Sequence, residues 1–275
     1  MPQDLSVPQK IVMIGSPLDH VRSPDLINAM LQSAGIGATV ITCEITAHEL
    51  DGFVAAARGD PTIAGLIVTT PLKQSICAYL QKKTPLVSMI SAANCVRCDD
   101  EGWVGANFDG FGFINALRQH SQFKQECTVL LLGCGGAGTA IAASMMSCVG
   151  VKLCLYGTNS GRAASLSAKL SAFARRADIK VLRSPDVAAD IVINASPIGM
   201  SDEDASSVPD AVLDHAVIVA DIVVRPDTRL KQEARRRGKM LVDGEQMVQG
   251  QAEFLWRFVL GKAAREEDVL DATAL

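Results

Sequence analysis

The first part of the chain alternates short apolar runs with longer stretches in which apolar residues recur at helical spacing. The apolar runs 11–14, 38–43 and 63–68 have the length of strands, and the stretches 25–34 and 47–57 have the length of helices. Strands that alternate with helices in this way are typical of a mostly parallel sheet covered by helices. The pattern therefore predicts an α/β domain at the start of the chain.

Local signals extend this first domain. Thr46 and Glu49 stand at capping-box spacing, which predicts that the second helix begins there. Residues 92–104 favour two short strands around a turn at 99–102, and a helix at 112–120 is predicted to follow.

A second alternation of strands and helices follows the polar stretch 121–126. Its predicted strands are 128–132, 152–156, 181–182, 191–194 and 217–221, and its predicted helices are 137–147 and 161–175. A last helix at 245–260 is apolar on one face, and because it follows the complete second sheet, we expect it to pack back on the first domain. The sequence thus predicts a domain of residues 1–120, joined by the returning segment 244–275, and a Rossmann domain of residues 121–243.

The composition excludes several classes of protein. Of the 275 residues, 48% are hydrophobic and 20% are charged, which is enough apolar material for a packed core. The net charge of −4 and the lack of any basic run longer than Arg235–Arg237 argue against nucleic acid as a partner. The first ten residues lack the apolar core of a signal peptide, and no apolar run reaches membrane-spanning length. We therefore expect a cytoplasmic protein without a membrane partner.

The eight cysteines give no metal or disulfide signal. A chain of this size has no need of disulfides, so we expect reduced thiols. Cys95 and Cys98 match a CxxC spacing, but no second pair completes a zinc site, and positions three apart in a strand face opposite ways. No metal is expected.

A glycine-rich segment gives the strongest chemical signal. The segment matches GxGxxG, follows an apolar strand directly and opens a helix, and its cofactor-binding candidates are Gly133, Gly135, Gly136, Ala137 and Gly138. In a dinucleotide site these glycines allow the tight turn, the close approach of backbone to pyrophosphate and the packing of helix on strand. The free amides at the helix start favour the phosphates. The alternative is a purely structural glycine turn.

The end of the next strand favours NADP over NAD. A ribose-binding Asp or Glu is expected there in NAD enzymes, whereas this chain has Thr158, Asn159 and Arg162 and no carboxylate. Hydroxyl, amide and guanidinium groups suit a 2′-phosphate. NAD stays an alternative, because Arg162 also fits a solvated helix position.

Several segments, in order from Gly15 to Trp256, resemble the shikimate and quinate dehydrogenase family. They are Gly15-Ser16-Pro17, His20-Val21-Arg22-Ser23-Pro24, Val68-Thr69-Thr70-Pro71-Leu72-Lys73, Ala93-Asn94, Asn107-Phe108-Asp109-Gly110, the glycine loop, Asn194-Ala195-Ser196, and Asp243-Gly244 through Met247 to Gln251. The resemblance implies a substrate-binding and catalytic domain followed by a Rossmann domain. It also implies a nicotinamide-dependent dehydrogenase of aromatic amino acid biosynthesis that acts on an alcohol.

The resemblance further implies roles for individual residues. Lys73 and Asp109 correspond to the catalytic pair, and the chemistry agrees, because oxidation of a secondary alcohol needs an acceptor for its proton. The implied substrate contacts are Ser23, Thr69, Asn94, Asn107 and Gln251. The implied further cofactor contacts are Asn194, Gly244 and Met247.

The chain departs from the family pattern where a substrate carboxylate is expected. Val21 replaces the first of two hydroxyl residues, Val224 replaces a tyrosine, and Phe108 replaces a threonine. Loss of a charge-assisted hydrogen bond costs about 1.5 to 3 kcal/mol, so we expect weak shikimate binding or a different polyol acid. Arg22 and Arg225 are candidate substitute anchors.

Two other functions stay open on the sequence. A related two-domain dehydrogenase, such as a folate-linked one, needs aromatic stacking surface, and aromatic residues make up only 4% of the chain. A non-catalytic dinucleotide sensor would keep the glycine loop without needing the lysine and the carboxylate. The sequence leaves the exact substrate, the oligomeric state (monomer or homodimer) and the physiological direction of reaction undecided.

Overall fold

The computed structural model describes residues 8–19, 21–99, 102–119, 123, 126–148, 150–173, 178–201 and 208–261. His20, the centre of the turn 99–102, the end of the helix predicted to reach 175 and residues 262–275 lie outside the described residues, as does most of the predicted boundary 121–126. The chain forms two compact units. Unit 1 ends at Phe108 and resumes at Gln251, and unit 2 runs from Asp109 to Gly250.

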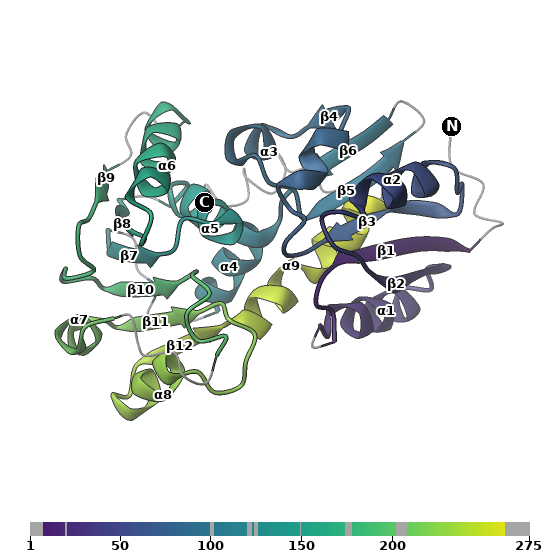
Figure 1. Ribbon diagram of the computed structural model, residues 1–275. Coiled ribbons are helices and arrows are strands. Elements are labelled where there is room, and N and C mark those ends of the chain that lie inside the picture. Colours follow the sequence, from purple (N-terminus) through teal and green to yellow (C-terminus); the bar gives the residue numbers. More distant parts are fainter. Residues whose placement is uncertain are drawn as a thin grey trace. The chain divides into compact units, whose positions relative to one another are not determined.

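Unit 1 is built on a mixed six-stranded sheet in the order β2-β1-β3-β5-β6-β4 (Figure 1). Its strands are β1 (Gln9–Gly15), β2 (Ala38–Glu44), β3 (Ile63–Val68), β4 (Lys82–Lys83), β5 (Cys95–Asp99) and β6 (Gly102–Ala106). β1 pairs in parallel with β2 and β3, and β4 pairs in parallel with β6. The sheet is mostly parallel, as predicted, and only β5 is antiparallel to its neighbours β3 and β6. With β6 it forms the hairpin that the two short strands around the turn 99–102 predict.

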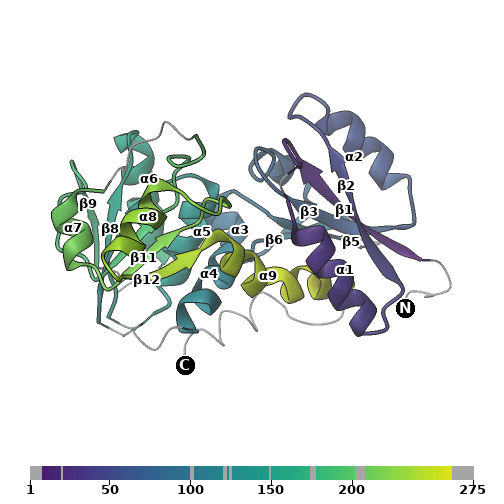
Figure 2. The same ribbon diagram turned by 90° about the horizontal axis from the view of Figure 1, so that it is seen from below.

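Helices cover both faces of this sheet (Figure 2). They are α1 (Ser23–Ser33), α2 (Leu50–Arg58), a 3₁₀ turn η1 (Ser75–Tyr79), α3 (Pro85–Ile90) and the end of α9 (Gly244–Val259). Val12 and Ile14 of β1 join α2, η1 and α3 in one apolar core. The alternate residue Met13 faces the other way, toward Ser23 of α1.

The second helix of unit 1 begins later than the capping-box pattern predicts. The Thr46 backbone N–H and hydroxyl both donate to Glu49 Oε2, at 2.8 and 2.7 Å. Residues 47–49 nevertheless form a turn, and α2 starts at Leu50. The carboxylate therefore closes a turn before the helix instead of capping its first residues.

Unit 2 is a six-stranded sheet with every pairing parallel, in the order β12-β11-β10-β7-β8-β9. Its strands are β7 (Thr128–Leu132), β8 (Lys152–Tyr156), β9 (Asp178–Val181), β10 (Ile191–Asn194), β11 (Ile218–Asp221) and β12 (Met240–Asp243). Its helices are α4 (Asp109–Arg118), α5 (Gly136–Met145), α6 (Ser160–Phe173), α7 (Asp210–His215) and α8 (Arg229–Arg236), with the start of α9. Counted from β7, the order is 3-2-1-4-5-6, which is that of a dinucleotide-binding Rossmann sheet.

The last helix returns to unit 1, as the sequence predicts. Phe254 and Phe258 of α9 contact the ring of Phe108 at centroid distances of 6.3 and 5.6 Å. On the same face, the Cys95 thiol donates to the Leu255 carbonyl oxygen at 3.5 Å. Apolar burial and ring contacts therefore hold the end of α9 against the unit 1 sheet.

Candidate active site

The segment after β3 brings two predicted site residues to one end of the unit 1 sheet. The Thr69 N–H donates to the Ile14 carbonyl oxygen at 2.9 Å, which ties the segment to β1. A Cβ on Gly15 would lie 2.4 Å from Thr69 Cγ2, so only glycine allows this approach. Thr69 and Lys73 are both half-buried. The Thr69–Lys73 segment is thus fixed at the carboxyl end of β3, where ligand sites of α/β sheets form.

Backbone and amide hydrogen bonds join Lys73 to the other predicted substrate residues of unit 1. The Ala93 N–H donates to the Lys73 carbonyl oxygen at 2.8 Å, and Asn94 is the next residue. Asn94 Oδ1 accepts from the Phe108 N–H at 2.9 Å, and Asn94 Nδ2 donates to Gln251 Oε1 at 2.9 Å. The network therefore links the segment after β3, the start of β5, the end of β6 and α9.

The amides in this network are buried. Asn94 is 3% exposed, Gln251 is 6% exposed and Asn107 is 1% exposed. Asn107 Nδ2 donates to the Ala92 carbonyl oxygen at 3.2 Å. Buried polar side chains need hydrogen-bond partners. The partners named here therefore fix the orientations of these amides.

Ser23 lies at the start of α1 with a weak partner. Its side chain is buried, and its hydroxyl donates to the Met13 sulfur at 3.8 Å. A thioether is a poor acceptor, so the hydroxyl is able to exchange it for a stronger one. The neighbouring Val21 is half-buried and Arg22 is exposed.

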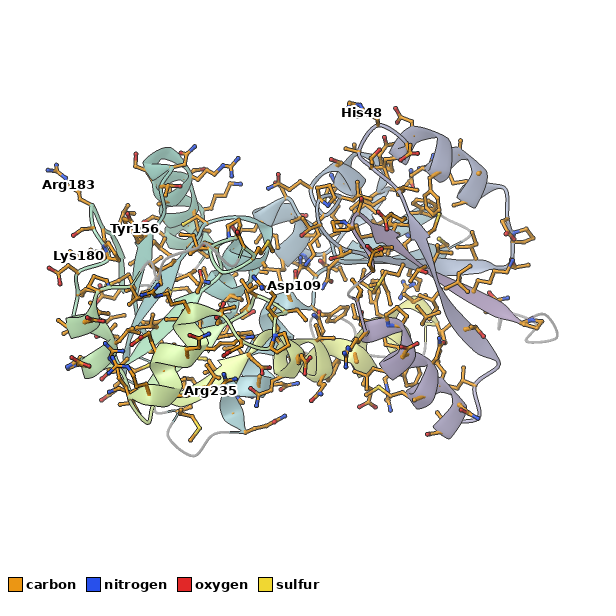
Figure 3. All side chains as sticks on the ribbon, turned by 60° about the horizontal axis from the view of Figure 1, so that its bottom comes forward. His48, Asp109, Tyr156, Lys180, Arg183 and Arg235 are labelled. Carbon is orange, nitrogen blue, oxygen red and sulfur yellow. The ribbon has the colours of Figure 1, made fainter. Side chains whose placement is uncertain are left out.

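Asp109 is the first residue of α4 in unit 2 and is only 2% exposed. Asp109 is labelled in Figure 3. A carboxylate at a helix start is stabilised by the helix dipole. The next residue, Gly110, packs so closely on α5 that an added Cβ would lie 2.3 Å from the Ala140 carbonyl oxygen. The small Gly110 therefore fixes the start of α4 and with it Asp109.

The glycine loop between β7 and α5 has the geometry that a dinucleotide needs. Gly133 has φ +98°, a conformation that favours glycine. A Cβ on Gly138 would lie 2.0 Å from the Gly133 carbonyl oxygen, whereas a Cβ on Gly135 would meet nothing within 4 Å. These are the three glycine roles of a dinucleotide loop: the tight turn, the helix packing and the open approach to the pyrophosphate. Gly136 and Ala137 form the half-buried first turn of α5.

The predicted 2′-phosphate residues surround the start of α6. Asn159 Oδ1 accepts from the Arg162 N–H at 3.0 Å, and Thr158, Asn159 and Arg162 are all exposed. Arg183, which follows the adjacent strand β9, is also exposed at the outer edge of unit 2 (Figure 3). This end of the sheet therefore offers cationic and polar side chains to a ligand.

The predicted cofactor residue Asn194 uses all the donors and acceptors of its side chain in hydrogen bonds within the protein. Its Nδ2 donates to the Ile198 carbonyl oxygen and to Asp221 Oδ1, and its Oδ1 accepts from the N–H and the hydroxyl of Ser196. Since an amide has two donors and two acceptor sites, nothing is left for a ligand. Asn194 therefore orders the segment after β10.

Sequence reasoning missed a buried polar group next to Asn194. Asp221, Thr228 and Lys231 are each 3% exposed or less. Asp221 ends an apolar strand and Thr228 caps α8, which are signals that a sequence carries. The burial of Lys231 has no such signal, because α8 has charged residues at most of its positions.

Cys95 and Cys98 face opposite sides of the unit 1 sheet, as their spacing within a strand predicts. Cys95 faces α9, whereas Cys98 packs against the apolar core on the other face of the sheet. All eight thiols are free, and burial raises the pKa of Cys98 to about 12. Within the described residues, no group of three His, Cys, Asp or Glu side chains is placed to hold a metal ion. The same residues contain no helix that is both long and apolar enough to cross a membrane.

Comparison with known proteins identifies the family. Residues 13–96 match the family model for the shikimate dehydrogenase substrate binding domain. The chain is also 31% identical to the shikimate dehydrogenase (NADP(+)) of Rubrobacter xylanophilus, over 86% of this chain and 85% of that protein. The chain belongs to the shikimate dehydrogenase family.

Other members of the shikimate dehydrogenase family match over the full length. The shikimate dehydrogenase (NADP(+)) of Thermosynechococcus vestitus is 30% identical over 100% of this chain and 97% of that protein. The structure of shikimate 5-dehydrogenase from Thermus thermophilus, in complex with NADP(H) and shikimate, has a TM-score of 0.82 at 25% identity. The match covers 97% of this chain and 100% of that one. The two-domain α/β architecture with a Rossmann sheet is therefore shared along the chain.

Three departures from the shikimate dehydrogenase pattern have different structural consequences. Phe108 is fully buried and packs on α9, so its change is one of packing within unit 1. Val224 is 39% exposed, and Arg225 donates through Nη1 to the carbonyl oxygens of Gly199 and Met200. Val21, which is half-buried, and Val224 thus keep apolar surface accessible, whereas Phe108 does not.

Proposed function

We propose that this protein is an NADP-dependent dehydrogenase of the cytoplasm that acts on a cyclic hydroxy acid of the shikimate or quinate type. The observation that carries the proposal is the combination of a dinucleotide-shaped glycine loop with the amide network around Asn94. The glycine loop supports the cofactor assignment, and the family supports the substrate class. Residues 1–120 with the returning segment 244–275 serve as the substrate domain in this proposal, and residues 121–243 as the cofactor domain.

The cofactor contacts follow the fold of unit 2. Gly133, Gly135, Gly136, Ala137 and Gly138 hold the pyrophosphate through backbone amides at the start of α5. Thr158, Asn159 and Arg162 bind the 2′-phosphate, which favours NADP over NAD. Gly244 and Met247, both buried at the start of α9, complete the pocket, and Asn194 orders it. The bound dinucleotide supplies the acceptor for a hydride.

The proton chemistry belongs to Lys73 and Asp109. Oxidation breaks the carbinol C–H bond, whose electron pair leaves with the hydride, and forms a C=O bond as the hydroxyl proton departs. In this proposal Lys73 accepts that proton as the hydride leaves, and the Asp109 carboxylate relays it onward. In the reverse direction the Lys73 ammonium returns the proton and stabilises charge on the carbonyl oxygen.

The substrate contacts follow the buried amides. Thr69, Asn94, Asn107 and Gln251 bind or orient the ring hydroxyls, because amides and hydroxyls both donate and accept. Ser23 holds the carboxylate by exchanging its sulfur partner for a charged oxygen. Val21 and Val224 weaken that end, which favours low shikimate affinity or a polyol acid that differs at the carboxylate position.

A steady-state assay tests the proposal. NADPH formation is followed with shikimate and with quinate, and NADPH consumption with their dehydro forms, with NAD(H) in parallel. We expect turnover with at least one pair and a preference for NADP(H). Lys73→Ala should lower kcat by about 10²- to 10⁴-fold without changing NADPH affinity. The exposed Lys83 of β4 gives the matched control Lys83→Ala, which should keep wild-type kcat.

Two outcomes of this assay would contradict the proposal. Cofactor binding without turnover of any of these compounds would favour the dinucleotide sensor. Turnover that is unchanged in Lys73→Ala would remove Lys73 from the chemistry. The oligomeric state, expected to be a monomer or a homodimer, is measured by gel filtration with light scattering.

A further inference from the structure

Lys231 carries a buried ammonium group that the catalytic proposal does not use. Its side chain lies on α8 and is only 2% exposed. Nζ donates to the Val223 carbonyl oxygen at 2.9 Å and also to the carbonyl oxygen of Arg225. Both carbonyls belong to residues 222–227, which we call the β11 loop because it follows β11. Burial of a charge costs free energy. Because both acceptors of this ammonium lie in the β11 loop, we ask what the loop does.

The β11 loop is held from its other side by a buried carboxylate. Asp221 Oδ1 accepts from the Val223 N–H at 3.3 Å and from Asn194 Nδ2 at 3.0 Å. Asp221 Oδ2 accepts from the Thr228 hydroxyl, which caps α8. Burial lowers the pKa of Lys231, and the negative charges of Asp221, Asp243 and Glu245 oppose that effect while the positive charge of Arg235 adds to it. Ammonium and carboxylate thus both hold Val223, the first through its carbonyl oxygen and the second through its N–H.

Through Arg225, the β11 loop reaches the segment that follows β10. Arg225 Nη1 donates to the carbonyl oxygen of Met200 at 2.9 Å and to that of Gly199 at 3.2 Å. The same segment begins at Ala195, whose carbonyl oxygen would lie 2.6 Å from a Cβ on Gly133. The β11 loop is therefore connected through one intervening segment to the glycine loop.

At its other side, the β11 loop contacts the start of α9. A Cβ on Gly244 would lie 2.5 Å from the Ile222 carbonyl oxygen and 2.9 Å from Val224 Cγ2. Gly244 and Met247 are the α9 residues that the proposed function assigns to the cofactor. The β11 loop thus lies between the start of α9 and the segment after β10, all within unit 2.

We propose that Lys231 is a positioning residue of the cofactor site: its buried ammonium fixes the β11 loop, and the β11 loop sets the segment after β10 and the start of α9 around the dinucleotide. This inference rests on the proposed function for the identity of the ligand. The hydrogen bonds from which we argue are those of the protein without a ligand.

The first test measures the loop without any cofactor. In hydrogen–deuterium exchange of the full-length apo protein, Lys231→Met should make the amides of Val223 and Arg225 exchange about tenfold faster, since hydrogen bonds to a charged donor are lost. Lys239→Met is the matched control, because Lys239 Nζ donates to the Asp214 carbonyl oxygen at 2.6 Å, away from the β11 loop. The control should leave exchange of residues 222–227 unchanged. Wild-type exchange of these residues in Lys231→Met would overturn the proposal.

The second test measures NADPH affinity by fluorescence titration. Lys231→Met should raise the Kd about five- to tenfold, with the melting temperature almost unchanged, because an apolar group replaces a charge whose burial is costly. Faster loop exchange with wild-type NADPH affinity would mean that Lys231 only stabilises the fold, and would contradict a positioning role.

A second variant keeps the proposal testable if Lys231→Met does not fold. Arg225→Gln leaves the buried charge in place and breaks the contacts to Gly199 and Met200, so it should weaken NADPH binding in the same range. Unchanged affinity in Arg225→Gln would contradict the proposed route. If wild-type protein fails to bind NADPH, the proposed function fails, whereas the exchange experiment still reports on the loop.

Discussion

Asn94 and Gln251 share a buried hydrogen bond in unit 1, although 157 residues separate them in the chain. Asn94 precedes β5 and Gln251 lies in α9, so the bond forms only when the returning helix is seated on the unit 1 sheet. Both amides are proposed to contact the substrate. On that proposal, substrate recognition and the docking of the last helix depend on the same pair.

Asn94→Ala should damage stability and substrate binding together. The variant leaves Gln251 Oε1 and the Phe108 N–H without their partners, and each buried unpaired group costs about 1 to 3 kcal/mol. We expect a loss of about 3 kcal/mol in urea unfolding and a rise in substrate KM of about tenfold.

A double-mutant cycle with Gln251→Ala tests whether the pair acts as a unit. Because the two side chains are in contact, the summed costs of the single variants should exceed the cost of the double variant by about 1 kcal/mol. Strictly additive costs would show that the hydrogen bond contributes nothing to stability.

The glycine loop allows cofactor binding to be separated from folding. Gly135→Ala should keep the wild-type melting temperature, because its Cβ meets nothing within 4 Å, but should weaken NADPH binding by about tenfold or more by blocking the pyrophosphate. Gly138→Ala should instead destabilise the protein, because its Cβ would lie 2.0 Å from the Gly133 carbonyl oxygen. Thermal unfolding and NADPH titration of both variants check this, and equal behaviour of the two would contradict the assigned glycine roles.

Val21→Ser should improve the use of shikimate. Val21 is half-buried two residues before Ser23, so a hydroxyl there adds a second charge-assisted hydrogen bond to the carboxylate. We expect the shikimate KM to fall about tenfold with kcat nearly unchanged, and Val21→Ala to give no improvement. An equal or higher KM in Val21→Ser would show that the missing hydroxyl is not what limits binding.

Phe108→Thr, in contrast, should not help substrate binding. The Phe108 side chain is fully buried against Phe254 and Phe258, so the smaller residue leaves a cavity and an extra hydroxyl in the contact with α9. We expect a loss of about 3 to 5 kcal/mol in the free energy of unfolding. A stable variant with improved shikimate KM would mean that Phe108 borders the ligand.

Local pattern was enough to predict much of the fold. The apolar runs give most strands to within two residues, and the strand, glycines and helix around residues 128–147 predict the Rossmann core that the sheet order confirms. The short elements η1, β4, α3, α7 and β12 were missed, because segments of two to six residues are too brief to show a period. The antiparallel pairing of β5 with β3 is a tertiary contact, which no local pattern determines.

The sequence predicted which residue types form the candidate site, but not which hydrogen bonds they make. The motif around Asn94 predicts a polar contact, but its partner Gln251 comes from the far end of the chain. Lys231 could not be found at all, since a lysine in a helix as charged as α8 is expected in solvent. Its burial is explained by tertiary contacts with the carbonyl oxygens of Val223 and Arg225.

Transfer of a labelled hydrogen tests the central claim most directly. Shikimate or quinate, whichever is turned over, is prepared with deuterium on the carbon that bears the oxidised hydroxyl, and the reduced cofactor is analysed by mass spectrometry. We predict that each NADPH formed carries one deuterium atom and that Lys73→Ala lowers the rate without lowering the deuterium content of the product. Reduced cofactor without deuterium, or cofactor that binds and is never reduced, would contradict hydride transfer from a carbinol carbon.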